Sequence, residues 1–392
     1  MLTSLALLIL FAFLSYALFE KIKLPGILGF IFSGLVFGPN CLNLAHPQIL
    51  EFTTEFKLLA LIIILVRAGF SLNVQEIRNE KKVILNLSFF PLIAEAIVIS
   101  LFLYFAFQFP FILSLITGLI IAPIAPAVVI PQMLRLKDAE AFKNKKLVNT
   151  LLASASLDNV WILSVFGVLV SIASQPNLSL NTLTPIPLSL VNGILLGAIL
   201  GFLLTILFKK VHIRDTKKVF IILFLCVLVK ELSIIVPLSS YLAIICASLI
   251  LLIKLEAVAH RLAQKFAKLW ILAELLLFVL IGLNTDIHSL VSLGPWAIAL
   301  ILVGLLIRYG AMMLVLKKEE LSLEEKRYAA ASFIPKATIQ AVLGGIPLSL
   351  GLPYGSYILA LSTLSIIISV PLGTLLSSFE YKNICKKTSS QL

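Results

Sequence analysis

Long runs of apolar residues, separated by short polar connections, extend through the chain from end to end. Each run is about twenty residues long, which is the length at which an α-helix crosses the hydrocarbon core of a bilayer. The pattern predicts an all-α polytopic membrane protein with 13 transmembrane helices. We expect the spans near residues 2–19, 25–42, 55–72, 83–107, 110–134, 147–174, 187–208, 218–236, 239–254, 266–284, 295–316, 325–350 and 353–378.

The composition agrees with a membrane location, since 60% of the residues are hydrophobic and 13% are charged. The net charge of +12 does not indicate a nucleic-acid-binding protein, because the basic residues are dispersed over short connections. Lysine and arginine concentrate in alternate connections, so the positive-inside rule places the N-terminus outside and the C-terminus in the cytoplasm. We predict a multi-pass protein of the cell inner (plasma) membrane, in contact with anionic lipid.

The sequence contains no sign of a cofactor or a resident metal. Its four cysteines and four histidines lack the spacing of a metal site or a redox motif, and we expect no disulfide. The connections between spans are too short to hold a large soluble domain. We therefore predict a function within the bilayer.

Four ionisable residues lie deep within predicted spans, where each costs about 2.5 to 3.5 kcal/mol on insertion scales. They are Glu95, Asp158, Arg308 and Lys336. Such residues are candidates for a functional site by default. For Glu95 and Arg308 two interpretations stay open, a functional pair and an ion pair that only holds helices together. For Asp158, which is followed by the amide Asn159, the functional interpretation is favoured.

Prolines interrupt two of the predicted spans. Pro123, Pro126 and Pro131 stand within nine residues of the fifth span, and Pro335 precedes Lys336 in the twelfth. Because proline removes a hydrogen-bond donor and clashes with the preceding turn, both helices must open. Backbone groups freed at the middle of the membrane must face a polar cavity or packed protein. The two breaks therefore predict an ion site.

The spacing of these residues indicates two copies of one structural unit. Glu95 precedes Pro123 by 28 residues, and Arg308 precedes Pro335 by 27. The two copies are spans four to six and spans eleven to thirteen, and we expect them to have opposite orientations in the membrane. Paired broken helices in inverted repeats are typical of secondary transporters that work by alternating access.

Four segments of the chain resemble those of a known family. LIIILVRAGFSL, APIAPAVVIPQML, SASLDNV and IPKATIQAVLGG are similar to segments of the sodium/proton antiporters in the cation/proton antiporter superfamily. The similarity is to the branch with a paired aspartate in span six, among bacterial relatives of the animal antiporters. It implies a homodimer with two crossing discontinuous helices, five and twelve. It also implies a dimerisation scaffold of residues 1–82 and 187–284, with span seven as a linker, and an ion-transporting core of residues 83–174 and 295–378.

The resemblance also implies roles for individual residues. Asp158 and Asn159 occupy the paired-aspartate positions, and Lys336 corresponds to the lysine of the crossing helix. Glu95 and Arg308 correspond to an ion pair of the core. The second position of the pair, where the family has an aspartate, is an asparagine in this chain. We therefore expect a lower charge carried per cycle or weaker cation binding.

Exchange requires a carboxylate that holds either a proton or a cation. We expect Asp158 to be that group, with neutral oxygens from Asn159 and Thr338 and with Lys336 as its charge partner. The expected cargo is Na⁺, with K⁺ and Li⁺ as further candidates, exchanged for protons in pH homeostasis. Two alternatives stay open. One is a transporter of another solute on the same framework, such as a symporter of organic anions, and the other is a non-transporting relative with a structural salt bridge.

Overall fold

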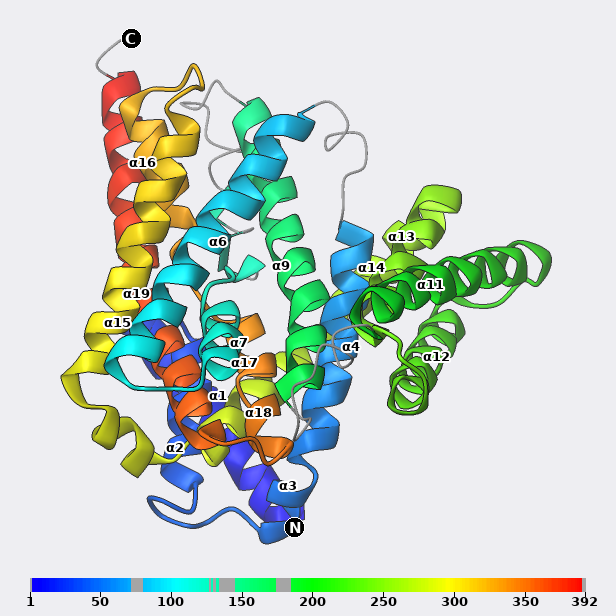
Figure 1. Ribbon diagram of the computed structural model, residues 1–392, viewed down its shortest axis with the longest axis horizontal. Coiled ribbons are helices and arrows are strands. Elements are labelled where there is room, and N and C mark those ends of the chain that lie inside the picture. Colours follow the sequence, from blue (N-terminus) through cyan, green and yellow to red (C-terminus); the bar gives the residue numbers. More distant parts are fainter. Residues whose placement is uncertain are drawn as a thin grey trace. The chain divides into compact units, whose positions relative to one another are not determined.

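The computed structural model of the chain describes residues 2–71, 80–126, 128–129, 132–133, 145–173 and 185–389. Within these ranges the regular structure is helical, with no strand (Figure 1). Pro131 lies outside the described residues. The α-helices are α1 (Leu2–Lys21), α2 (Ile27–Phe37), α3 (Pro47–Glu51), α4 (Thr53–Ser71), α6 (Lys81–Ala106), α7 (Phe111–Ile121), α9 (Lys145–Ala173), α11 (Pro185–Lys210), α12 (Asp215–Ile235), α13 (Ser240–Lys254), α14 (Glu256–Asn284), α15 (Ile287–Leu316), α16 (Leu323–Ser332), α17 (Thr338–Leu343), α18 (Ile346–Ser349) and α19 (Gly355–Ser389).

Among the described residues, each predicted span overlaps a helix or a helix in pieces. Among the described residues, seven helices are long and apolar enough to cross a membrane, by length and composition. The fifth span begins as the short helix α7, and the twelfth is divided among α16, α17 and α18. These observations agree with the prediction of an all-helical, multi-pass membrane protein.

Two helices begin well before the residues that hydropathy predicts. The helix α14 begins at Glu256 instead of residue 266, and α15 begins at Ile287 instead of residue 295. In α15 the extra segment is set off by a kink at Gly294, where φ is 61°. Pro295 follows directly and cannot donate a helical hydrogen bond. The extra segment is therefore not a straight continuation of the apolar span.

The chain divides into two compact units. The first comprises Met1–Phe52, Gln75–Asn159 and Phe278–Leu392, and the second comprises Thr53–Val74 and Val160–Leu277. All of the candidate ion-site residues fall in the first unit. The units differ in extent from the expected scaffold and core, because residues 1–52 group with the first unit. The functional division of the chain stays a prediction.

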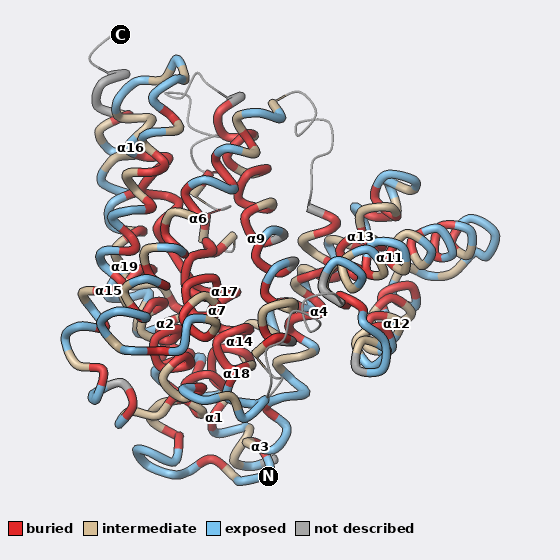
Figure 2. Tube along the Cα trace, viewed as in Figure 1, coloured by how far each residue is buried: buried red, intermediate tan, exposed pale blue. Residues whose placement is uncertain are grey.

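In the first unit, α6 packs against α7 and α15, and α19 packs against α15 and α16. A glycine permits the close approach of α7 to α6. A Cβ atom at Gly118 would lie 2.4 Å from the carbonyl oxygen of Ala96. Every residue of α17 and most residues of α7 are buried (Figure 2). The segments that flank the two breaks therefore lie inside the unit.

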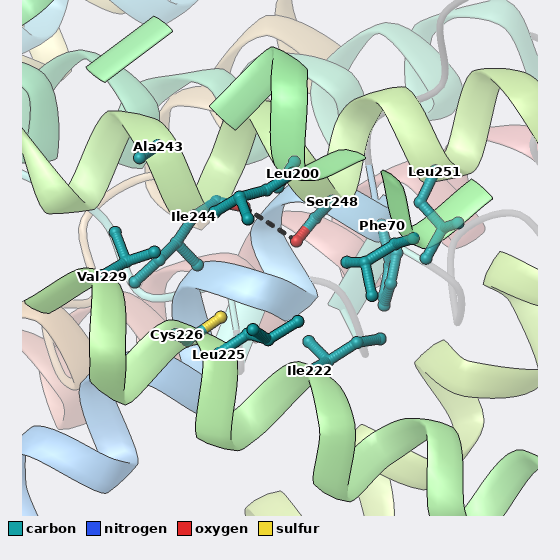
Figure 3. A pocket seen from close by; sticks show the side chains of 12 residues that line it. Phe70, Leu200, Ile222, Leu225, Cys226, Val229, Ala243, Ile244, Ser248 and Leu251 are labelled. Carbon is teal, nitrogen blue, oxygen red and sulfur yellow. Dashed lines mark hydrogen bonds between the residues drawn. The ribbon is translucent and has the colours of Figure 1, made fainter. Parts of the chain in front are cut away.

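In the second unit, α13 packs against α4, α11 and α12. These helices line a cavity with an apolar wall (Figure 3). The hydroxyl of Ser248 donates to the carbonyl of Ile244 in the same helix at 2.9 Å, and none of the described residues that line the cavity is charged. The cavity lining thus offers no carboxylate to a cation.

Candidate ion-binding site

The two broken helices meet at their breaks. The chain is not helical from Ala122 to Ala125, after α7, nor from Phe333 to Ala337, between α16 and α17. The Ala125 amide donates to the carbonyl of Pro335 at 2.9 Å, so the breaks are in direct contact. Pro123 and Pro335 lie within the non-helical segments, and Pro126 is the first helical residue after one of them.

Side chains from other elements bind the backbone groups that the first break exposes. The amide nitrogen of Gln340 donates to the carbonyls of Ile121 and Pro123, at 3.0 and 2.7 Å. The Ile124 amide donates to Oδ2 of Asp158 at 2.9 Å. An unpaired backbone group buried away from water is costly, so these bonds stabilise the open conformation. Gln340 lies in the segment IPKATIQAVLGG, but it was not a candidate from sequence.

Four buried charges form one connected cluster around the breaks. Arg308 Nη2 lies 2.7 Å from Oδ1 of Asp158, and Arg308 Nη1 lies 3.2 Å from Oε2 of Glu95. Lys336 Nζ lies 2.6 Å from the same Oε2. The carbonyl of Ala122 accepts hydrogen bonds from Arg308 Nη1, at 2.7 Å, and from Lys336 Nζ. All four charged side chains have 0% exposure, so each charge depends on its partners for compensation.

The pairing within the cluster differs from the expected one. Lys336 was expected to be the charge partner of Asp158, but its ammonium contacts Glu95 directly. The two oxygens of Asp158 accept from the Arg308 guanidinium and from the Ile124 amide. A guanidinium has several donors in a planar fork, and Arg308 uses them to bridge both acids. Glu95 and Arg308, expected to form an ion pair, are in contact.

The neutral candidates Asn159 and Thr338 are both buried, with 6% and 3% exposure. Asn159 follows Asp158 in α9, and Thr338 is the first residue of α17, after the second break. Oδ1 of Asn159 has no hydrogen-bond partner among the described residues. The same holds for Oε1 of Glu95 and Oε1 of Gln340. The structure thus offers buried oxygen atoms with free lone pairs on these three side chains.

A side chain of α19 binds the backbone at the second break. The amide of Lys336 donates to the hydroxyl of Ser369 at 2.9 Å. This bond fixes the backbone from which the Lys336 ammonium extends. Ser369 was not a candidate from sequence, because a serine in a transmembrane helix usually bonds its own preceding turn. No cluster of three or more metal-ligating side chains is found in the described part of the chain.

Comparison with known proteins gives one family. The model of the family described as "Sodium/hydrogen exchanger, transmembrane" matches residues 9–379. The chain is 28% identical over 356 residues to "Sodium/hydrogen exchanger 9B2" of Xenopus tropicalis, a match that covers 87% of this chain and 66% of that protein. It is 27% identical over 368 residues to "Sodium/hydrogen exchanger 9B1" of Homo sapiens, covering 90% of this chain and 71% of that protein. The chain thus spans about two thirds of the length of these relatives.

The fold also matches a solved structure. The sodium proton antiporter MjNhaP1 from Methanocaldococcus jannaschii, solved at pH 8, superposes with a TM-score of 0.82. The match covers 98% of each chain at 19% sequence identity. At that identity the likeness is evidence for the fold alone.

Proposed function

Because the chain belongs to the sodium/hydrogen exchanger family, a family of membrane transporters and not of enzymes, we propose that it exchanges a monovalent cation for protons at the buried charge cluster around Asp158. Na⁺ is the first candidate for the cation, followed by K⁺ and Li⁺. The observation that carries the proposal is the position of the cluster. Asp158 is fully buried and binds the backbone of a broken helix through Ile124, which is the place where secondary transporters hold their ions.

The proposed exchange depends on competition for one carboxylate. Asp158 binds a proton or a cation, and the neutral oxygens come from Asn159, the next residue in α9, and from Thr338, the first residue of α17. In this conformation both Asp158 oxygens already accept hydrogen bonds, from Arg308 and from Ile124. Each of these oxygens has a second lone pair, so a cation can bind Asp158 beside Arg308 and the Ile124 amide.

Alternating access would come from two inverted repeats, spans four to six and eleven to thirteen, that move as a core against a scaffold. The proposed scaffold comprises residues 1–82 and 187–284, and it carries the contacts of a homodimer. The contact between the breaks, from Ala125 to Pro335, supports a core in which α7 and α17 belong to crossing helices. We propose 13 spans in the inner membrane, with the N-terminus outside and the C-terminus in the cytoplasm, as the distribution of lysine and arginine indicates.

Everted membrane vesicles with an acidic interior test this function. Addition of sodium should dissipate the proton gradient in vesicles that contain the wild-type protein, and Asp158→Asn should abolish the effect. The matched control is Asp286→Asn, which removes a carboxylate from the N-cap of α15. Dissipation that persists in Asp158→Asn would remove Asp158 from its proposed role. A wild-type protein that responds to none of Na⁺, K⁺ and Li⁺ would contradict the exchange itself.

A further inference from the structure

One peptide group separates the side chain of Gln340 from that of Asp158. The Ile124 amide donates to Oδ2 of Asp158 at 2.9 Å, and the carbonyl of Pro123, in the same peptide group, accepts from Nε2 of Gln340 at 2.7 Å. The described residues contain no cis peptide bond, so the N–H and the C=O of this group point in opposite directions. Asp158 therefore faces the donor end of the peptide, and Gln340 faces the acceptor end.

The Gln340 amide is held in place from both sides. Its nitrogen has two hydrogens and uses both, since Nε2 also donates to the carbonyl of Ile121 at 3.0 Å. The side chain has no exposed surface, and α17 packs against α7 and α19. Oε1 of Gln340 has no hydrogen-bond partner among the described residues, so no competing contact there draws the amide away. Gln340 thus fixes the orientation of the peptide that links Pro123 to Ile124.

The carbonyls of the first break are suitable ligands for a dehydrated cation, but each of them is occupied. Small hard cations prefer carboxylate and carbonyl oxygens. Gln340 binds two of the three carbonyls from Ile121 to Pro123, and the third, that of Ala122, accepts from two charged side chains. A cation at Asp158 therefore meets the carboxylate without these three carbonyls.

We infer that Gln340 is a positioning residue that sets the cation selectivity of the exchange, because it keeps the Pro123 carbonyl turned away from Asp158. This inference rests on the proposed function and deepens it. The number of ligands and the strength of their field decide which monovalent cation a site prefers, and rings of carbonyl oxygens suit K⁺. A site that consists mainly of one carboxylate favours the smaller cation. The Gln340 contact therefore favours Na⁺ over K⁺.

Loss of the Gln340 amide should free the peptide. Proline fixes φ but not ψ, so the peptide between Pro123 and Ile124 can rotate once its carbonyl has lost its partner. A buried carbonyl without a partner is costly, and a cation at Asp158 offers it one. The cation then gains a neutral oxygen ligand, which shifts the preference towards the larger cation.

Exchange by the purified full-length protein in liposomes tests this inference. Proton flux is measured against the concentration of NaCl and, separately, of KCl, and the selectivity is the half-maximal concentration of K⁺ divided by that of Na⁺. Gln340→Met removes both donors and keeps an unbranched side chain of similar length. Gln340→Asn keeps the amide on a shorter side chain, which cannot reach both carbonyls. The control is Gln264→Met, the same change at an exposed residue of α14.

We expect the wild type and Gln264→Met to reach half-maximal exchange at a lower concentration of Na⁺ than of K⁺. In Gln340→Met the selectivity should fall by about tenfold, which corresponds to about 1.4 kcal/mol of differential binding. Gln340→Asn should shift the selectivity in the same direction, and it decides the question by itself if Gln340→Met does not fold.

Two results would overturn the inference. One is a wild-type protein that exchanges K⁺ at least as readily as Na⁺. The other is a folded Gln340 variant in which the responses to the two cations fall in equal proportion, complete loss included, because a residue that only stabilises the fold has that effect. Both results leave the proposed function standing if the wild type exchanges a cation for protons. A wild type that exchanges none of Na⁺, K⁺ and Li⁺ contradicts the function and the inference together.

Discussion

Arg308 and Asp158 form a fully buried ion pair between α15 and α9, with Nη2 of the arginine 2.7 Å from Oδ1 of the aspartate. The same guanidinium reaches Glu95 in α6 through Nη1. One side chain thus connects three helices at the level of the first break. Removal of one partner of a buried pair is strongly destabilising, since it leaves a buried charge without compensation.

Replacement of Arg308 by methionine should therefore lower stability substantially. Asp158 loses its charge partner and Glu95 loses one of two, and the expected cost is about 3 to 5 kcal/mol in the free energy of unfolding. Arg327→Met is the control, because Arg327 is exposed in α16. Thermal unfolding of both variants in detergent measures the difference. Equal midpoints for the two variants would show that the buried pair does not hold the helices.

A second carboxylate beside Asp158 should change how the exchange responds to voltage. Asn159→Asp adds a negative charge at a buried position whose Oδ1 has no partner among the described residues. The charge moved per cycle should then differ, because a further ionisable group takes part in binding. Sodium-driven proton flux is measured in vesicles at several imposed membrane potentials. Identical dependence on potential in wild type and variant would contradict this expectation.

Hydropathy predicted the positions of the helices because a bilayer requires long apolar segments with internally satisfied backbones. It failed where a helix continues beyond the apolar segment. The first turns of α14 contain Glu256, His260 and Arg261, so the helix begins before its hydrophobic part. It also missed α3, a single short helix that begins with Pro47 after His46, whose side chain accepts from the Gln48 amide.

The residues of the charge cluster could be selected from sequence because ionisable side chains are rare in apolar spans. Their pairing could not, since it depends on the depth and rotation of several helices that are far apart in the chain. Lys336 contacts Glu95, which is 241 positions away in the sequence, and a helical repeat predicts contacts only between residues close together in the chain. Gln340 did have a signal: a side chain with two amide donors, shortly after Pro335, can bind the carbonyls that a break exposes.

The contact between α19 and the second break should be sensitive to a single methyl group. A Cβ atom at Gly373 would lie 2.6 Å from Cδ and Cγ of Pro335, and the proline ring has little freedom to move away. We expect Gly373→Ala to cost about 1 to 3 kcal/mol and to reduce exchange. In the control Gly310→Ala, the new Cβ meets no atom within 4 Å.

Stability and exchange rate are measured for both glycine variants. Gly310→Ala should keep wild-type exchange and should gain up to about 1 kcal/mol, since alanine favours a helix over glycine. If Gly373→Ala resembles Gly310→Ala in both measurements, the packing of α19 on Pro335 does not restrict the site.

A charge cluster at the start of α12 should make part of the stability depend on pH. Burial raises the pKa of Asp215, but hydrogen bonds from Arg261 at 2.8 Å and Lys218 at 3.2 Å outweigh it, so the pKa lies below its usual value. In the unfolded chain the aspartate has its ordinary pKa of about 3.9, so it binds a proton more tightly there than in the folded protein. The ionised aspartate therefore stabilises the folded state above that pH, and the contribution disappears as the pH falls further.

The variant Asp215→Asn isolates this contribution. The difference in unfolding midpoint between wild type and variant should be largest at neutral pH and should shrink in strongly acidic buffer. Comparison with the variant removes the effect of other acids that titrate in the same range. A difference that is the same at neutral and acidic pH would mean that ionised Asp215 contributes nothing.

Coupled flux of both ions, measured with the purified protein in liposomes that contain no other protein, tests the central proposal most directly. Radioactive sodium outside and an acidic interior supply the two gradients, and the same preparation reports internal pH. We predict that sodium enters as protons leave, that sodium uptake is slower when the proton gradient is absent, and that Asp158→Asn shows neither flux. Equal sodium uptake with and without the proton gradient, or uptake by Asp158→Asn at the wild-type rate, would contradict the account.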